Sequence, residues 1–332
     1  MREVHMFHLS RPVALTAAVS MTAVLAGPGA AYAADTATSL SAAEMSAALK
    51  TVATASTAAT SKGWRATMGL SGSLSATGLF VVDPAAGVVF DRTIIGRQMT
   101  ADYAVAGKGL YEYLADPSAR SALKMMRLPA VKFVFTANKA LKLDAYVKDA
   151  AIAPSTVLTE DTARAGTKTA HDDGTVDYKF RDESGAAVTM HVDAAGVLAS
   201  ARANDDGVNV ALTYTYGPQR VTIPAAPATV SAAALTQGMA YLTMPATVAG
   251  VAKQATDDAR RASRGHKVKV ATLRQVVRRD VTAANAELTV TMVKTKNVTK
   301  GVRVYATNPW TRKTVAYTIK ASGTKVVLTK NG

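Results

Sequence analysis

Hydrophobic residues recur along the chain with two periods, and the change between them separates predicted helices from predicted strands. Between residues 40 and 61 apolar residues return every three or four positions, which predicts an amphipathic helix. Ser41 and Glu44 have the spacing of a capping box at its start. Over residues 64–70 apolar and polar residues alternate, which predicts a strand with one buried face.

Short alternating segments of this kind occur in two groups. The first ends near residue 113, and the second runs over residues 176–223 with turn sequences every ~8–12 residues. Between them we expect a helical island that begins at Asp116-Pro117, holds a second helix over residues 133–147 and ends at Pro154. The rhythm predicts an α+β, mostly β fold, in which an antiparallel sheet curls and has one apolar and one polar face.

A different organisation is expected near the C-terminus. Pro224, Pro227 and the alanine-rich residues 225–234 indicate a boundary, and residues 235–242 predict a short helix. Helices are then predicted at residues 248–264 and 269–279, and strands at residues 287–293, 302–306, 315–320 and 325–328. The predicted domains are a signal peptide at 1–33, a β domain at 34–227, a linker with a short helix at 228–250 and a basic module of helices and a β-meander at 251–332.

The N-terminus has the pattern of a secretory signal. Arg2 and Arg11 precede an apolar run at residues 13–26, and residues 31–33 (Ala-Tyr-Ala) place small side chains where a signal peptidase cleaves. We therefore expect an exported protein, extracellular or at the cell envelope, that begins at Ala34. The alternative is an uncleaved membrane anchor, although the run is shorter than the ~20 residues of a spanning helix. The sequence contains no cysteine, so we expect neither disulfides nor a lipid anchor.

The net charge of +15 is concentrated near the C-terminus. Residues 251–332 hold 18 Lys and Arg against four Asp and Glu, a net +14, which leaves the rest nearly neutral. This asymmetry indicates an anionic membrane or cell-wall surface as partner, and nucleic acid is not expected for an exported chain. A basic surface that serves solubility alone is the alternative. Six arginines that helical spacing can gather are the candidates for anionic-surface contact: Arg260, Arg261, Arg264, Arg274, Arg278 and Arg279.

Motifs of catalysis and cofactor binding are missing from the sequence. It has no H-E-x-x-H zinc motif, no G-x-S-x-G elbow, and no Walker or G-x-G-x-x-G loop. His171, His191 and His266 are far apart, and His191 is expected to be solvated on the polar face of a strand. We expect no enzyme activity, no cofactor and no metal site. A hydrolase whose site residues are dispersed in sequence is the weakest alternative.

The second group of strands ends in a distinctive phrase, and residues 212–227 read LTYTYGPQRVTIPAAP. With the preceding helix, the strand ending in glycine and the helical island, this phrase resembles the LolA-like superfamily, nearest the actinobacterial LppX/LprG lipoproteins, over about residues 41–227. The lipobox cysteine of those lipoproteins is absent. The resemblance implies a half-open antiparallel barrel with helices across its concave face, an apolar cavity for acyl chains of lipids or lipoproteins, and no catalytic residues.

Ten residues of the predicted strands are candidates to line such a cavity: Leu79, Phe80, Val81, Phe90, Tyr103, Leu110, Tyr178, Phe180, Met190 and Val210. A filled core built from the same residues is an equal alternative. The sequence thus predicts an exported binding protein that holds a lipid or other apolar ligand and docks to anionic surfaces through its basic module. The alternative function is a structural or regulatory envelope protein whose β domain binds another protein.

Overall fold

The computed structural model describes residues 35–148, 150–159, 164–182, 184–288 and 290–331, so the predicted signal peptide lies outside the described residues. The chain forms two compact units. The first unit comprises residues up to 110 together with 137–223, and the second comprises 111–136 and 224–332. Residues 111–136 therefore group with the C-terminal part, whereas the sequence analysis placed them in the β domain. None of the described helices is long and apolar enough to cross a membrane.

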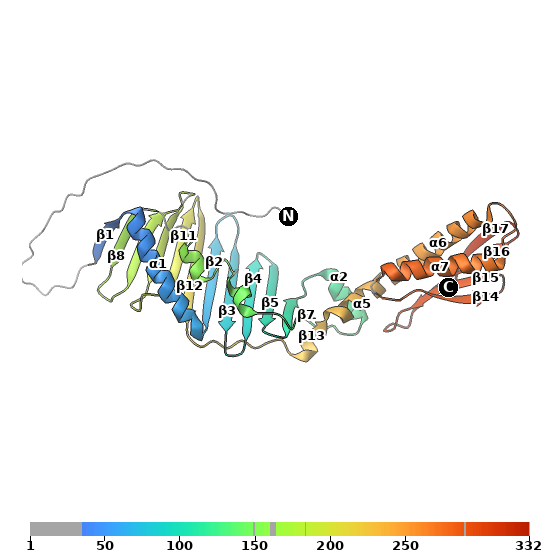
Figure 1. Cartoon of the computed structure of the whole chain (residues 1–332), viewed down its shortest axis with the longest axis horizontal. Coiled ribbons are helices and arrows are strands. Elements are labelled where there is room, and N and C mark those ends of the chain that lie inside the picture. The colour runs from blue at the N-terminus through green and yellow to red at the C-terminus, as the bar shows by residue number, and fades with distance from the viewer. Residues whose placement is uncertain (1–34, 149, 160–163, 183, 289, 332) are drawn as a thin grey trace, which may run out of the picture. The chain divides into compact units, whose positions relative to one another are not determined.

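A broad sheet, called here the large sheet, forms the first unit (Figure 1). Its strands are adjacent in the order β1-β8-β9-β10-β11-β12-β2-β3-β4-β5, and neighbouring strands are antiparallel. The pairing of β12 with β2 joins the two predicted groups of strands. The bounds are β1 (Thr36–Leu40), β2 (Trp64–Ser71), β3 (Ala76–Asp83), β4 (Val88–Ile95), β5 (Gln98–Val105), β8 (Gly166–Ala170), β9 (Val176–Arg181), β10 (Ala187–Val192), β11 (Leu198–Asp205) and β12 (Val208–Tyr216).

Three further strands complete the strand order: β6 (Gly109–Tyr113), β7 (Phe133–Ala137) and β13 (Thr229–Ser231). With them, thirteen of the described strands make one sheet. β13 pairs in parallel with β7, so the sheet is mixed, and the prediction of a wholly antiparallel sheet is wrong at this point. The fold is α+β as predicted, while the curling of the sheet stays a prediction.

Helix α1 (Ala42–Ala59) lies across one face of the large sheet, with α3 (Leu143–Lys148) and α4 (Pro154–Thr159) on the same face (Figure 1). The predicted capping box at its start is confirmed. Ser41 Oγ accepts a hydrogen bond from Glu44 N at 3.4 Å, and Glu44 Oε2 accepts one from Ser41 N at 2.8 Å. A short 3-10 turn, Thr60–Lys62, then leads into β2.

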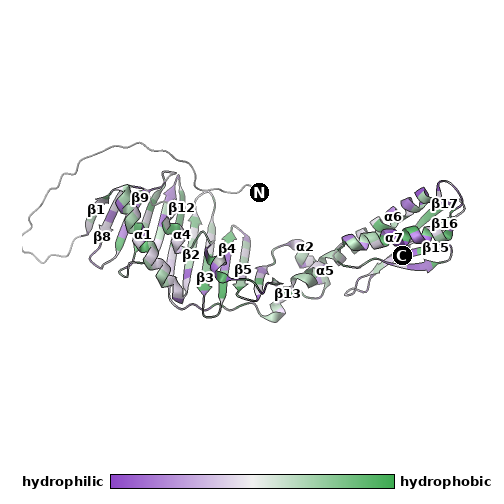
Figure 2. Ribbon diagram, viewed as in Figure 1, coloured by the Kyte–Doolittle hydropathy of each residue, from purple (hydrophilic) through white to green (hydrophobic). Residues whose placement is uncertain are grey.

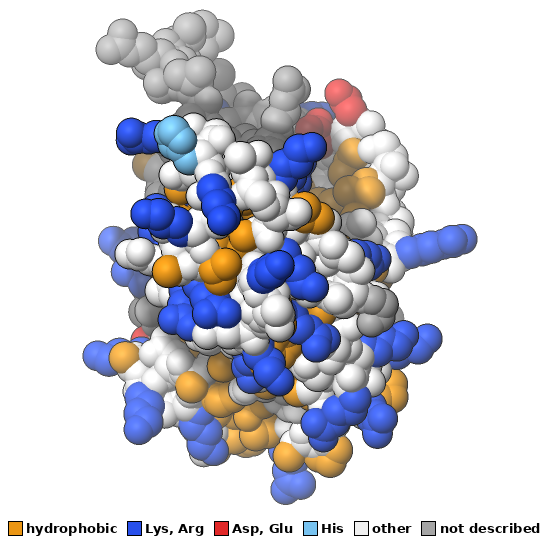
Figure 3. All heavy atoms as spheres, turned by 90° about the vertical axis from the view of Figure 1, so that its right-hand side faces the viewer, with side chains coloured by type: hydrophobic (Ala, Val, Ile, Leu, Met, Phe, Trp, Pro, Cys, Tyr) orange, Lys and Arg blue, Asp and Glu red, His pale blue; other side chains and the backbone are white. Residues whose placement is uncertain are grey.

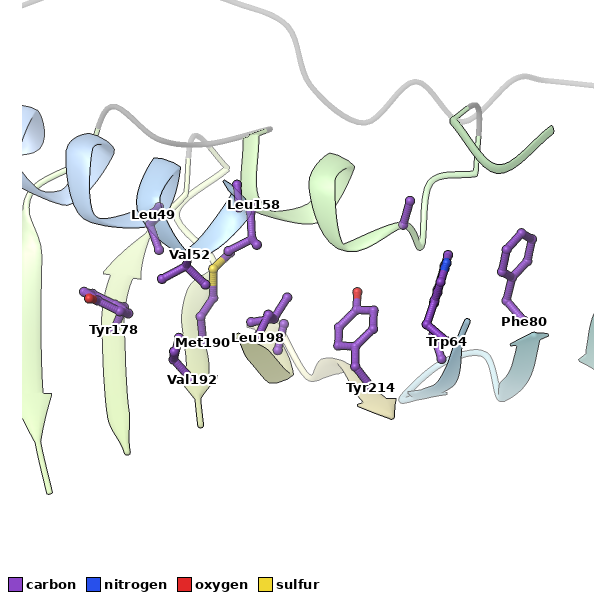
Figure 4. Close-up of a cluster of buried hydrophobic side chains, with 14 of the residues drawn as sticks. Leu49, Val52, Trp64, Phe80, Leu158, Tyr178, Met190, Val192, Leu198 and Tyr214 are labelled. Carbon is purple, nitrogen blue, oxygen red and sulfur yellow. The ribbon is translucent and has the colours of Figure 1, made fainter. Parts of the chain in front are cut away.

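The space between these helices and the sheet is filled by a hydrophobic core. The Trp64 side chain is 1% exposed, and its ring centroid lies 5.2 Å from that of Phe80 and 6.4 Å from that of Tyr214. Leu198 N donates a hydrogen bond to Ser56 Oγ of α1 at 2.9 Å, which fixes the helix on β11. Figure 4 labels ten of the buried core residues: Leu49, Val52, Trp64, Phe80, Leu158, Tyr178, Met190, Val192, Leu198 and Tyr214.

The second unit contains a smaller antiparallel sheet in the order β14-β15-β16-β17, called here the small sheet. Two helices pack on one of its faces around fully buried Val248, Val277, Val304 and Ile319. Hydrophobic and hydrophilic residues lie along the strands of both sheets (Figure 2). The bounds are α2 (Pro117–Met125), 3-10 turn Ala226–Ala228, α5 (Ala232–Leu242), α6 (Met244–Ser263), α7 (Val270–Glu287), β14 (Lys294–Val298), β15 (Gly301–Thr307), β16 (Thr314–Ser322) and β17 (Lys325–Asn331).

Two predicted features of the helical island are wrong. Residues 133–137 form β7 and not the start of a helix, because Phe133, Val134 and Phe135 are aromatic or β-branched and favour strands. Pro154 begins α4 instead of ending the island, since proline is accommodated at the first position of a helix.

The predicted strand at residues 287–293 is also absent from the described part of the chain. Helix α7 continues to Glu287, and the first strand begins at Lys294. The side chain of Asn285 replaces strand pairing here: its Oδ1 accepts hydrogen bonds from Met292 N at 3.1 Å and Val293 N at 3.0 Å, and its Nδ2 donates to Val293 O at 2.8 Å.

Candidate functional site

The large sheet has a second face, opposite α1, on which apolar residues also gather. Side chains alternate along a strand, so neighbours in β3 lie on opposite faces. Phe80 belongs to the core beneath the helices, and Leu79 and Val81 therefore lie on the other side, called here the outer face of the large sheet. The register sets Val81 opposite Phe90, and Phe90 opposite Tyr103, on this same face.

Residues 217–223, called here the strap, follow β12 and pass beside this apolar area. Asp83, at the end of β3, is 5% exposed and holds the strap. Its Oδ2 accepts a hydrogen bond from Val221 N at 3.2 Å, and its Oδ1 accepts one from Ala86 N at 3.0 Å. Pro218 has no N–H group and Val221 N is committed to a carboxylate, so the strand predicted at residues 221–223 does not form.

A groove of about 280 Å³ lies between the strap and the outer face of the large sheet. Its floor is apolar, and the rings of Phe90 and Tyr103 pack with their centroids 4.5 Å apart. Apolar and polar groups share the lining in a way typical of ligand sites, which combine hydrophobic contact with a few orienting polar groups. The lining residues are Arg65, Leu79, Val81, Phe90, Tyr103, Gln219, Arg220, Val221 and Thr222.

Three arginines lie at this groove or beside it on the same face of the sheet. Arg65 and Arg220 line it, and the register places Arg92 opposite Leu79 on the same face. Within the described part of the chain none of the three forms an ion pair. Burial raises the pKa of Tyr103 above its ordinary value, while the positive charge of Arg92 acts in the opposite direction. The groove thus joins an apolar floor to two arginines, Arg65 and Arg220, that form no ion pair within the described residues.

The structure divides the ten cavity candidates between two faces. Four of them line the groove on the outer face: Leu79, Val81, Phe90 and Tyr103. Five belong to the helix-covered core or pack against it: Phe80, Leu110, Tyr178, Phe180 and Met190. By alternation with Tyr214, Val210 lies on the helix-covered side of β12. The ten residues therefore do not line one common cavity, because consecutive strand residues cannot share a face.

A wider and more open hollow of about 780 Å³ lies at the ends of β9 and β10. Its lining mixes charged and apolar residues, among them Lys179, Arg181, Asp182, Phe180 and Val188. This hollow is more open than the groove beneath the strap, so it would enclose less of a ligand's surface. The groove beneath the strap is the better candidate because it is more enclosed and because packed aromatic rings form its floor beside two arginines.

Two histidines that are distant in sequence meet on the outer face of the large sheet. His191 Nδ1 lies 2.8 Å from Asp177 Oδ1, and His171 lies 3.0 Å from Asp35 through Nδ1 and 3.5 Å from Asp177 through Nε2. The hydrogen bond to Asp35, with the charges of both carboxylates, raises the pKa of His171. His191 is therefore paired, whereas a merely solvated residue was expected. No group of His, Asp or Glu in the described ranges is arranged to hold a metal ion.

The six arginines proposed for anionic-surface contact are mostly engaged within the second unit. Three pair with aspartates of the same two helices, so their positive charge is largely balanced where it lies. Arg264 ends α6 in a left-handed conformation with φ 46°. The other contacts are Arg260–Asp257 at 3.1 Å, Arg261–Asp258, Arg279–Asp280 at 2.8 Å, Arg278 Nη2 to Asn297 Oδ1 at 3.2 Å, and Arg274 Nη2 to Val298 O at 3.1 Å.

Comparison with known proteins gives a distant structural similarity. No protein family profile matches the chain, and no curated protein matches it. LprF from Mycobacterium bovis has a TM-score of 0.30 and 13% identity, and the match covers 56% of this chain and 98% of that one. An uncharacterized conserved protein from Thermus thermophilus has a TM-score of 0.28 and 12% identity, over 55% of this chain and 98% of that one.

Three features of the site were not predicted from the sequence: Arg65, Arg220 and the anchoring role of Asp83. Asp83 precedes Pro84, a pair typical of turns, and it accepts a hydrogen bond from Ala86 N. A signal for the strap was present in the phrase over residues 212–227, where a strand sequence runs into glycine and proline. That phrase contains the strap, but the sheet residue that holds the strap, Asp83, can be identified only from the register of β3.

Proposed function

We propose that the first unit is a non-enzymatic binding module that holds an amphiphile, a lipid or similar molecule with an apolar chain and an anionic head, in the groove beneath the strap. The observation that supports this proposal is the groove itself, whose apolar floor lies beside arginines that form no ion pair within the described residues. The N-terminal sequence pattern supports a location outside the cell or at the envelope, where lipids and their fragments are available ligands.

The floor and the rim of the groove suit different parts of such a ligand. Burial of an apolar chain against Leu79, Val81 and Phe90 gains about 25 cal/mol per Å² of apolar surface removed from water. A carboxylate or phosphate at the end of the chain would accept hydrogen bonds from Arg65 or Arg220, and a guanidinium matches these anions with two parallel N–H groups.

The size of the groove limits the ligand. A volume of about 280 Å³ is at the lower end of the ~300–1,000 Å³ that small-molecule sites span. A single chain is therefore a better fit than a lipid with two chains. The strap is held in place over the groove by hydrogen bonds from Val221 N to Asp83 and from Gly217 N to Gly63 O.

Binding of cis-parinaric acid, a fluorescent chain with one carboxylate, tests the proposal. We expect the double variant Arg65→Gln/Arg220→Gln to weaken binding of the acid by about tenfold or more, because hydrogen bonds to charged groups are each worth about 1.5–3 kcal/mol. Its methyl ester has no anionic head, so both proteins should bind the ester equally. Leu79→Asp places a charge on the apolar floor and should weaken binding of acid and ester alike.

A matched control is Arg202→Gln, which removes an exposed arginine from the same face of the sheet at a distance in strand order from the groove. This variant should bind both probes as the unmodified protein does. If the unmodified protein binds neither probe, the result would support the alternative function, in which the β domain binds another protein. The tightly packed core beneath the helices favours that alternative over a cavity at that place.

A further inference from the structure

The small sheet of the second unit also has a face that its helices do not cover. Val302, Val304 and Ile319 lie in the core beneath α6 and α7. Alternation therefore places Arg303, and with it Lys320, on the opposite side, called here the outer face of the small sheet. The outer face consists of Arg303, Lys320 and the residues that lie on the same side of the sheet in all four strands.

Positive side chains occupy that face on all of its strands. The register sets Lys296 opposite Arg303, and Lys294 opposite Tyr305. The guanidinium carbon of Arg303 lies 5.6 Å from the centroid of the Tyr305 ring, a cation–π distance. The five basic residues of the outer face are Lys294, Lys296, Arg303, Lys320 and Lys325, and the four lysines are exposed.

The distribution of acidic residues distinguishes this face from the helices. Residues 288–332 contain nine Lys and Arg and no Asp or Glu. The four acidic residues after residue 250 lie on α6 and α7, where Asp257, Asp258 and Asp280 pair with arginines. In the view of Figure 3, Lys and Arg side chains are spread between hydrophobic areas, and Asp and Glu side chains are few. Uncompensated charge is therefore a property of the sheet more than of the helices.

We propose that the outer face of the small sheet docks the protein on an anionic lipid bilayer. A sheet face presents its lysines side by side, so several can approach a planar surface together, and each gains from the negative surface potential. Val327, which is 43% exposed, and Tyr305 lie among these cations. Apolar and aromatic groups surrounded by long basic side chains suit the headgroup region, where the stems of Lys remain in apolar contact and the amines reach phosphates.

A linear polyanion is the less favoured partner. Such polymers bind best in a positively charged groove that follows their backbone, with aromatic rings for stacking if they carry bases. The basic residues of the outer face lie on four adjacent strands of a sheet and do not follow one line, as a polymer backbone would require. Docking through this face and ligand binding in the groove of the first unit are separate properties, so loss of one leaves the other measurable.

Sedimentation with vesicles tests the docking face. The chain from Ala34 onward, which omits the apolar N-terminal run, is mixed with vesicles of phosphatidylcholine alone or with about a third phosphatidylglycerol. We expect binding to the anionic vesicles only, decreasing with salt as the Debye length falls below ~8 Å. The variant Lys294→Gln/Lys296→Gln/Lys320→Gln/Lys325→Gln should bind the anionic vesicles more weakly by on the order of a hundredfold or more.

A helix variant with the same loss of charge is the matched control. The variant Lys253→Gln/Arg261→Gln/Arg264→Gln/Arg278→Gln removes four exposed positive charges. Lys253 and Arg261 lie on α6, Arg264 caps the end of α6, and Arg278 lies on α7. We expect this variant to retain most of the binding. Equal loss in both variants, loss in the helix variant alone, or binding that ignores salt would overturn the assignment to the sheet. Binding to a linear polyphosphate without binding to anionic vesicles would overturn the choice of a bilayer. Circular dichroism of both variants confirms that they are folded.

Discussion

The two sheets of this protein cover one face in the same way and use the other face differently. In both, helices close over Val, Ala, Leu and Met side chains that are almost completely buried. The outer face of the large sheet carries an apolar floor beneath the strap and a paired cluster of histidine and aspartate. The outer face of the small sheet carries five basic residues and no acidic residue on its described strands.

This difference separates the requirements of folding from those of binding. A helix-covered face must be apolar because its residues leave water when the protein folds. An outer face is less constrained, since it keeps exposed or half-exposed side chains such as Leu79 and Lys320 beside buried ones such as Val81. Its composition therefore points to a partner: an amphiphile for the groove and an anionic surface for the basic sheet. The following predictions test this separation, from the largest expected effect to the smallest.

Truncation of a core residue should have the largest effect on stability. Trp64→Ala removes a ring that is 1% exposed and packs against Phe80 and Tyr214. We expect the free energy of unfolding to fall by about 3–5 kcal/mol, the usual cost of deleting a large buried side chain. Urea denaturation followed by tryptophan fluorescence is unsuitable for this variant, so circular dichroism should be used.

The control for Trp64 is Leu79→Ala on the outer face of the same sheet. Leu79 is only half-buried and contributes to the groove, so its loss should cost about 1 kcal/mol or less. If both substitutions destabilise the protein equally, the outer face would be part of the folding core and the distinction drawn between the two faces would fail.

A polar side chain in the second unit should have an intermediate effect. Asn285→Ala removes all three hydrogen bonds that Asn285 makes to Met292 and Val293, both nearly fully buried. Unsatisfied buried backbone groups cost about 1–3 kcal/mol, and we expect a loss of about 2 kcal/mol in thermal or urea unfolding. Asn297→Ala, at an exposed position on β14, should change stability by less than about 0.5 kcal/mol. If Asn285→Ala leaves the free energy of unfolding unchanged, residues 288–293 do not depend on this contact.

The histidine cluster should give the smallest effect, visible as a dependence on pH. The pKa of His171 is raised from its ordinary value of 6.5, first through its hydrogen bond to Asp35. Burial raises the pKa of Asp177, but the hydrogen bond and charge of His191 and the charge of His171 lower it by more. The net result is a pKa below the ordinary 3.8 of an aspartate. Protonated histidine thus stabilises the folded state below about pH 6.5, and this contribution is lost as the pH rises through the raised pKa.

Melting temperatures measured across this range test the cluster. We expect His171→Gln to melt below the unmodified protein near pH 5.5, and the difference to shrink above about pH 7. At the acid end the contribution declines again, as protonation of Asp177 removes its charge. The exposed His266, which lies outside the cluster, supplies the control: His266→Gln should follow the unmodified protein at every pH. A constant difference between His171→Gln and the unmodified protein would contradict the assigned ion pairs.

Local signals predicted many elements well. The capping box of Ser41 and Glu44 and the 3.6-residue period predicted α1, and strict alternation predicted β2, β9 and β10. Strands β1 and β8 were not foreseen, because Thr36–Leu40 and Gly166–Ala170 consist largely of Thr, Ala, Ser and Lys and have no apolar alternation. They form by pairing with each other at the edge of the sheet, a non-local interaction.

The candidate site was predicted only in part, for the same reason. Alternation alone separates Leu79 and Val81 from Phe80, but which of the two sets lies beneath the helices depends on how α1 packs. Asp83 and Val221 are 138 positions apart, and no local pattern relates a turn aspartate to a distant amide. The ion pairs of the helix arginines are likewise invisible in a count of charges.

The sequence by itself determined the period of each segment, the absence of cysteine and the accumulation of positive charge near the C-terminus, because these are properties of neighbouring residues and of composition. Tertiary structure alone decided which face of each sheet is buried, where the strap crosses and which cations keep their charge uncompensated. Those outcomes depend on contacts between distant residues: the register of β12 on β2, the bond from Val221 to Asp83, and the aspartates that meet arginines on α6 and α7. Register and packing, not local propensity, therefore position both proposed binding surfaces.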